Sequence, residues 1–125
     1  NALYDTYGHT GGDVLLQAFC ETLGNNIRKE IDWVARYGGE EFLIVLPETG
    51  VRQSLVVAER LRRAVENLEV SWADILLRCT ASFGAAELAE PEWSMDRLVR
   101  AADRSLYRAK QQGRNRVVAA AVKLR

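Results

Sequence analysis

Two adjacent glycines, Gly38 and Gly39, separate two strand-like runs and constrain the fold more than any other feature of this sequence. The first run is Trp-Val-Ala-Arg-Tyr at residues 33–37, and the second is Glu-Phe-Leu-Ile-Val-Leu at 41–46. A glycine pair between two such runs predicts a β-hairpin, because glycine adopts turn conformations that other residues avoid. The second run is almost wholly apolar, so we expect it to be buried on both faces, and Pro47 ends it.

Elsewhere, apolar residues recur at the three- and four-residue intervals of amphipathic helices, with strand-like runs between them. The predicted elements are helices over about 12–29, 51–68 and 98–109 and strands over 33–37, 41–46, 76–86 and 117–122. Gly113 is the expected terminator of the last helix. The order α-ββ-α-β-α-β predicts one α/β (α+β) domain over residues 1–125, with a mostly antiparallel sheet and helices packed against it.

The composition is typical of a soluble globular protein, with 48% hydrophobic and 27% charged residues among 125. Lys+Arg and Asp+Glu each number 17, so the net charge is zero and we expect no whole-surface attraction to nucleic acid or anionic lipid. No apolar run approaches the roughly 20 residues of a membrane span, and no signal peptide is visible. Cys20 and Cys79 are expected to be buried free thiols, which favours a cytoplasmic location.

Glu40 and Glu41, directly after the glycine pair, suggest a metal–triphosphate site at the hairpin. Glycines leave backbone N–H groups open to a bulky anion. Carboxylates are hard oxygen ligands of the kind that Mg²⁺ prefers when phosphates complete its coordination. The alternative is a plain hairpin turn with two solvated glutamates, and the spacing alone favours that alternative.

Basic residues gather near the C-terminus, where residues 97–116 contain seven bases against one acid, Asp103. The first four bases recur at helical spacing and fit a solvated helix face. Lys110 and Arg114 flank the helix end. There, a lysine acting as a point charge and an arginine donating in bidentate fashion suit the binding of phosphates.

His9 and Asp13 lie in a glycine-rich stretch near the start of the chain. A lone histidine in this setting is better interpreted as a structural hydrogen-bonding residue than as a general base. Asp13 either caps the first helix or accepts hydrogen bonds from the amino and imino groups of a guanine. The sequence alone favours the cap.

Together these blocks resemble the GGDEF family, the diguanylate cyclase domain, in its GGEEF variant. The resemblance rests on Asp5-x-x-Gly8-His9-x-x-Gly12-Asp13, Arg36-Tyr37-Gly38-Gly39-Glu40-Glu41-Phe42, Thr80-x-Ser82-x-Gly84 and Ala102-Asp103-x-x-Leu106-Tyr107-x-Ala109-Lys110-x-x-Gly113-Arg114-Asn115. It covers nearly the whole chain. Four blocks in the right order at natural distances are specific, and they outweigh the plain-hairpin alternative.

The resemblance implies a palm-like fold, as in nucleotide cyclases and polymerases, and condensation of two GTP molecules into cyclic di-GMP with release of two pyrophosphates. It implies Mg²⁺ or Mn²⁺ as cofactor and a homodimer for turnover, because each domain holds one GTP. It makes Glu40 the metal ligand and the group that assists deprotonation of the 3′-hydroxyl, with Glu41 in support. The substrate-binding residues that it implies are Gly38, Gly39, Lys110 and Arg114 for the phosphates and Asp13 for the guanine edge.

Three departures from the family pattern bear on this interpretation. The family's first strand, which carries a metal-binding aspartate, would precede Asn1, so we expect the domain to be N-terminally incomplete. The family's guanine-contacting asparagine is Tyr4 here, and a phenol lacks the paired donor and acceptor of an amide. The family's product-inhibition site, an Arg-x-x-Asp, is Lys29-Glu30-Ile31-Asp32 here, with Arg28 adjacent, and Arg60 matches a secondary arginine of that site. Lysine lacks the guanidinium fork, so we expect weak or absent inhibition.

Three functions are compatible with this pattern. The first is an active diguanylate cyclase output domain beneath an upstream sensory or dimerisation module. The second, favoured by Tyr4, is a degenerate domain that binds GTP or cyclic di-GMP and regulates a partner without making product. The third is an adenylate-cyclase-like palm acting on another nucleotide, which Asp13 disfavours because an acceptor there matches the donors of guanine.

Overall fold

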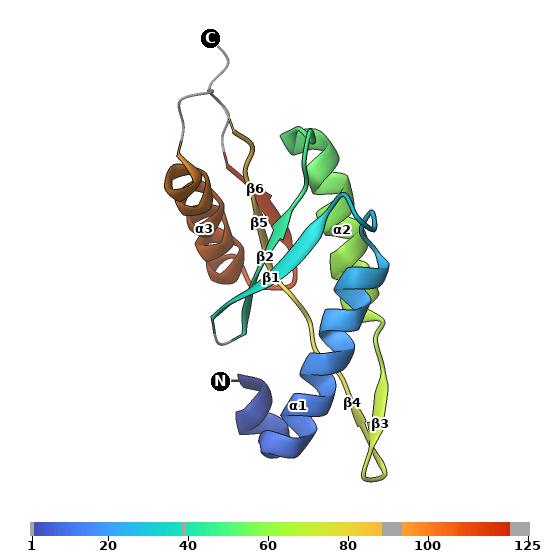
Figure 1. The fold of residues 1–125 in the computed structure, drawn as a ribbon. Coiled ribbons are helices and arrows are strands. Elements are labelled where there is room, and N and C mark those ends of the chain that lie inside the picture. The colour runs from blue at the N-terminus through green and yellow to red at the C-terminus, as the bar shows by residue number, and fades with distance from the viewer. Residues whose placement is uncertain (1, 39, 89–93, 121–125) are drawn as a thin grey trace. The chain divides into compact units, whose positions relative to one another are not determined.

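The computed structural model describes residues 2–38, 40–88 and 94–120, with helices beside short strand pairs (Figure 1). The elements are α1 (Ala2–Asn25), β1 (Trp33–Gly38), β2 (Glu41–Val45), α2 (Val51–Glu66), β3 (Val70–Trp72), β4 (Ile75–Leu77), β5 (Phe83–Ala85), α3 (Met95–Gln111) and β6 (Val117–Ala119). The strands of these residues form antiparallel pairs β1–β2 and β3–β4 and a parallel pair β5–β6. This is the α+β class that the sequence predicts. The chain divides into two compact units, Asn1–Pro47 with Arg63–Cys79 and Glu48–Arg62 with Thr80–Arg125.

Helix α1 of the first unit is interrupted at Gly8, whose backbone (φ 74°, ψ 176°) is not helical. Glycine takes that conformation without the Cβ clash that other residues suffer. The predicted helix over about 12–29 is therefore wrong at both ends, since α1 begins at Ala2 and ends at Asn25. Gly11 and Gly12, which precede the predicted apolar stripe, are buried inside the helix.

The predicted hairpin is confirmed by strands β1 and β2, which pair from Trp33↔Val45 to Gly38↔Glu41. The register shifts between Arg36 and Gly38, so the hairpin contains a bulge next to its turn. On β2, the Phe42 ring packs against Phe19 of α1, with centroids 5.2 Å apart. Residues 42–45 are half-buried, not fully buried as expected, because among the described strands β2 pairs only with β1.

The run at 76–86, predicted as one strand, belongs to two different pairs. Its first residues form β4, which makes a hairpin with β3 through Ala73 and Asp74, both with positive φ (48° and 64°). Its later residues form β5, which pairs in parallel with β6. The hairpin was not predicted because its two-residue turn contains no glycine, although the left-handed turn conformation usually favours one.

In the second unit, helix α3 packs on β5 and β6 through small residues (Figure 1). Ala101, Ser105 and Ala109 are buried on this helix. Opposite them, β5 approaches so closely that a Cβ on Gly84 would lie 2.8 Å from the Leu106 Cα. Ser94 is the N-cap of this helix, and its hydroxyl accepts a hydrogen bond from the Arg97 amide at 3.2 Å.

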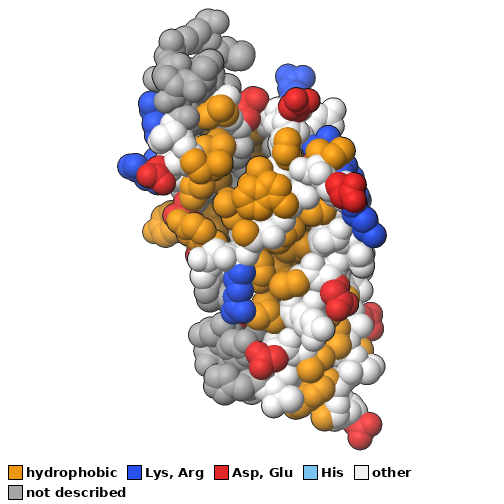
Figure 2. All heavy atoms as spheres, in the orientation of Figure 1, with side chains coloured by type: hydrophobic (Ala, Val, Ile, Leu, Met, Phe, Trp, Pro, Cys, Tyr) orange, Lys and Arg blue, Asp and Glu red, His pale blue; other side chains and the backbone are white. Residues whose placement is uncertain are grey.

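Apolar side chains remain on the surface, interspersed with charged ones on the face that Figure 2 shows. The exposed large apolar residues are Ile31, Trp33, Tyr37, Val56, Ile75, Leu76, Leu88, Met95 and Tyr107. Among the described residues, no helix combines the length and the hydropathy that a membrane crossing requires.

Candidate functional site

The β1–β2 hairpin places two carboxylates in succession at its turn. Glu40 lies in the turn and is half-buried, whereas Glu41 opens β2 opposite Gly38 and is exposed. A Cβ on Gly38 would meet nothing within 4 Å, so space beside the turn is open to a ligand. Gly39 lies outside the described residues. The hairpin therefore offers carboxylate oxygens next to an unobstructed backbone, which suits a cation together with a bulky anion.

The donor set at this hairpin fits Mg²⁺ or Mn²⁺, because carboxylate oxygens are hard ligands. Across the described ranges, no group of three or more His, Cys, Asp or Glu side chains is placed to hold a metal ion. Glu40 and Glu41 would thus hold the ion only in part. Substrate phosphate oxygens are the natural source of the remaining ligands.

Asp13 is exposed and lies inside α1, five residues beyond the kink at Gly8. It is therefore not the N-cap of the helix, which was the interpretation that the sequence alone favoured. Its role toward guanine remains a prediction. Tyr4 and His9 also lie in α1, but their side chains are outside the described part of the structure.

Lys110 and Arg114 both lie in the second unit, at and just after the end of α3. Lys110 is half-buried in the last helical turn, and Arg114 is exposed in the loop after it. Within the described part of the chain, the Arg114 guanidinium has no recorded partner, so it is available to an anion. Glu40 and Glu41 belong to the other unit, and each group is described within its own unit.

The remaining basic residues of α3 form an exposed helix face, as the sequence predicts. The arginines at 97, 100, 104 and 108 are all exposed. Their spacing of three and four residues places them along one side of the helix. They are distinct from Arg114, which leaves the helix altogether.

Among the residues that match the product-inhibition site, Asp32 already has a partner within the first unit. Asp32 is buried, and its carboxylate is held by Arg28, with Nη2 to Oδ1 at 2.7 Å and Nε to Oδ2 at 3.0 Å. The backbone N–H of Arg28 donates to the same carboxylate at 2.8 Å. Lys29 is exposed beside them, and Arg60 is exposed on α2 in the other unit.

The pairing of Asp32 with Arg28 was not predicted, although the sequence contains a signal for it. Arg28 precedes Asp32 by four residues, the spacing at which opposite charges pair within one turn. Arg28 also donates to the Pro47 carbonyl at 3.1 Å, so it ties the loop before β1 to the segment that follows β2. The Arg28–Asp32 pair is thus a structural element of the first unit.

The two thiols, Cys20 and Cys79, are free, as predicted, but they are half-buried and not fully buried as expected. Burial raises the pKa of the Cys79 thiol, and the negative charge of Glu40 raises it further. Burial also raises the pKa of the Cys20 thiol, but Arg36 acts in the opposite direction. Cys79 therefore lies within the electrostatic reach of the hairpin carboxylate.

These pKa shifts predict slow alkylation of the folded protein. A raised pKa lowers the thiolate fraction at pH 8, and the thiolate is the nucleophile. We expect iodoacetamide to label both cysteines more slowly in the folded protein than in urea, with Cys79 slower than Cys20. Intact-mass measurement over time checks this, with peptide mapping to assign each site. Labelling of native Cys79 at the denatured rate would contradict the prediction.

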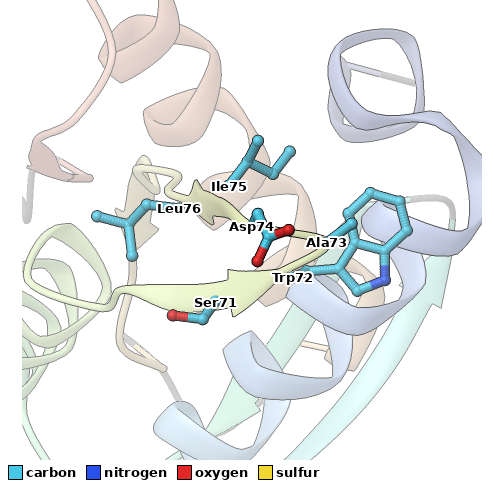
Figure 3. A pocket seen from close by; sticks show the side chains of 6 residues that line it. All are labelled: Ser71, Trp72, Ala73, Asp74, Ile75 and Leu76. Atoms are coloured by element: carbon cyan, nitrogen blue, oxygen red, sulfur yellow. The ribbon is translucent and has the colours of Figure 1, made fainter.

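A shallow hollow on the β3–β4 hairpin is lined by Ser71, Trp72, Ala73, Asp74, Ile75 and Leu76. All six side chains come from the two short strands and the turn between them (Figure 3). None of the site residues predicted from the sequence lines it. The hollow is therefore separate from the carboxylates of the β1–β2 hairpin.

Comparisons of this chain with known proteins agree on one family. The family model described as "Diguanylate cyclase, GGDEF domain" matches residues 1–116. Diguanylate cyclase DgcM of Escherichia coli is 45% identical over 116 residues, which cover 93% of this chain and 27% of that protein. The chain spans about a quarter to a third of the length of the curated relatives that it matches.

Solved structures with the same fold include diguanylate cyclase SiaD of Pseudomonas aeruginosa in complex with its activator SiaC. That structure has a TM-score of 0.88 at 35% identity, over 95% of this chain and 45% of that chain. The active GGEEF domain of a diguanylate cyclase from Vibrio cholerae has a TM-score of 0.84 at 27% identity. The match covers 98% of this chain and 76% of the Vibrio cholerae chain.

Proposed function

Because the chain belongs to the GGDEF family of diguanylate cyclase domains, we propose that it is the catalytic output domain of a cytoplasmic diguanylate cyclase. The proposed reaction joins two GTP molecules into cyclic di-GMP. Each 3′-hydroxyl oxygen forms a bond to the α-phosphorus of the other GTP, and each pyrophosphate leaves with the electrons of the broken P–O bond. Residues 1–125 act as one domain of a longer protein, beneath a sensory or dimerisation module, and turnover requires two copies.

The observation that carries this proposal is the pair of carboxylates at the turn of the hairpin, beside the open position at Gly38. Glu40 would hold a divalent metal ion there, and that ion would supply charge neutralisation to the triphosphate. Glu40 also accepts the 3′-hydroxyl proton, while Glu41 supports it. Lys110 and Arg114 bind phosphate oxygens and so orient the α-phosphate for attack. Asp13 accepts from the N–H groups of guanine.

A test of this function uses the full-length protein with GTP and Mg²⁺, and chromatography with mass detection of the product. Formation of cyclic di-GMP supports the cyclase. A folded, dimeric protein that consumes no GTP would overturn it. A parallel incubation with ATP checks the base assignment, because an aspartate acceptor at position 13 predicts strong preference for GTP.

Tyr4 favours a second candidate, a catalytically inactive domain that binds GTP or cyclic di-GMP and regulates a partner. Tyrosine presents one hydroxyl where the family has an amide, so the guanine edge loses a paired contact. Calorimetry separates the two candidates. Tight binding of GTP without product formation is the signature of the regulator, and a Tyr4→Asn variant that gains activity would locate the cause.

We expect cyclic di-GMP to be a poor inhibitor of turnover. Lys29 lacks the arginine fork, and the carboxylate of Asp32 is already bound by Arg28. Added cyclic di-GMP should therefore change the initial rate by less than about twofold. A Lys29→Arg variant should behave in the same way, because Asp32 stays paired. Initial rates against product concentration test this, and saturable inhibition of the wild-type protein would contradict it.

A further inference from the structure

The turn after α3 has an unusual backbone that depends on its neighbours. Gly113, Arg114 and Asn115 all have positive φ, at 118°, 64° and 46°. The left-handed region is disfavoured for residues with a Cβ, because that atom crowds the carbonyl oxygen. Two successive non-glycine residues persist there only where surrounding contacts impose the conformation.

Asn115 makes the contacts that hold this turn from outside. Its side-chain oxygen accepts a hydrogen bond from Arg62 Nη1 at 2.9 Å, and its backbone N–H donates to Ser82 Oγ at 3.1 Å. Arg62 lies 53 residues away in α2, and Ser82 lies 33 residues away just before β5. Two separate segments of the second unit therefore fix the same residue.

Arg62 is itself held in one orientation. Its Nε donates to both carboxylate oxygens of Glu59, at 2.6 and 3.1 Å, and its side chain is only 15% exposed. A guanidinium that shares a carboxylate through several N–H groups has a defined plane. The remaining terminal nitrogen then points its N–H at Asn115 from a fixed position.

The backbone of Arg114 is held by two hydrogen bonds, whereas its side chain is exposed. Its N–H donates to the Ala109 carbonyl at 2.9 Å, and its carbonyl accepts from Arg116 Nε at 3.1 Å. Its side chain is exposed, and within the described ranges no partner of its guanidinium is recorded. The turn thus presents the Arg114 guanidinium at the surface, where none of the described residues binds it.

We propose that Arg62 is a positioning residue for phosphate recognition, acting through Asn115 to fix the turn that carries Arg114. This inference rests on the proposed function, in which Arg114 binds the triphosphate. A bidentate contact depends on the placement of the fork. Loss of the Arg62–Asn115 bond lets the turn relax toward ordinary backbone angles, so the fork leaves its binding geometry.

The experiment measures binding of a non-hydrolysable GTP analogue with Mg²⁺ to the full-length protein by calorimetry. Arg62→Met keeps an unbranched apolar stem and removes the guanidinium donors, and we expect the Kd to rise about tenfold. Arg52→Met is the matched control on the same helix, at an exposed position, and should leave the Kd within about twofold. Melting temperatures confirm that the variants are folded. An unchanged Kd for folded Arg62→Met would overturn the inference.

A double-mutant cycle with Arg114→Ala separates positioning from a general structural effect. If Arg62 acts through Arg114, Arg62→Met has no further effect in the Arg114→Ala background. The same factor in both backgrounds would overturn the inference. Ser82→Ala, which deletes one oxygen at the other anchor, gives the same test should Arg62→Met fail to fold. If Arg114→Ala alone binds the analogue as tightly as wild type, the phosphate role in the proposed function is wrong, and this inference fails with it.

Discussion

Replacing Glu40 with alanine is expected to abolish cyclic di-GMP formation, with the rate falling about 10³-fold or more. In the proposed function, Glu40 both holds the divalent metal and accepts the 3′-hydroxyl proton. Its removal therefore deletes the ligand and the base together. No other predicted site residue combines two roles, so this substitution should have the largest effect on activity. The rate of product formation by the full-length protein measures it.

The fold should tolerate this change, because Glu40 lies in the turn between β1 and β2 and belongs to neither strand. We expect the free energy of unfolding to change by about 0.5 kcal/mol or less. Glu21→Ala is the matched control, since it removes an exposed carboxylate of the same unit from helix α1. It should retain wild-type activity. Wild-type turnover by Glu40→Ala would show that the hairpin carboxylate is not the metal ligand.

The long elements of this fold follow from local sequence patterns, whereas the short ones depend on tertiary contacts. The periodicity that predicted helices over 51–68 and 98–109 matches α2 and α3, because each helix has an amphipathic surface. Strands β3 and β5 have three residues each, too few for any alternation to be visible. Their partners are chosen by register and packing, which a run of apolar letters does not encode.

The features of the candidate site likewise divide into those that the sequence predicts and those that depend on tertiary contacts. The spacing alone favoured a plain turn for Glu40 and Glu41, and only the resemblance to the family made a metal site the prediction there. The hairpin itself was predictable from its glycine pair. The state of Asp32 was not, because the family pattern directs attention to Lys29 while the structure pairs the aspartate with Arg28. Nor does the sequence show that Asn115 joins α2 to the turn of Arg114, a contact between residues 53 positions apart.

The reason why position 84 is a glycine is visible only in the three-dimensional structure. Substitution of Gly84 has the largest expected effect on stability. A Cβ at this position would lie 2.8 Å from the Leu106 Cα, and closer still to the Leu106 nitrogen and the Ala102 carbonyl oxygen. All of these atoms are backbone, so no side-chain rotation relieves the clash. Gly84→Ala must push β5 away from α3, which opens the close approach of Gly84 to Ala102 and Leu106.

We expect Gly84→Ala to lower the free energy of unfolding by about 3 kcal/mol. With a urea slope of about 2 kcal/mol/M, the midpoint falls by about 1.5 M. Gly24→Ala is the matched control with the opposite sign. A Cβ at Gly24 meets nothing within 4 Å in helix α1, so alanine should stabilise the helix by about 0.5–1 kcal/mol. Because both variants add one methyl group, their difference measures the close approach of β5 to α3 rather than a general cost of replacing glycine. Equal midpoints for the two variants would contradict the packing described for the second unit.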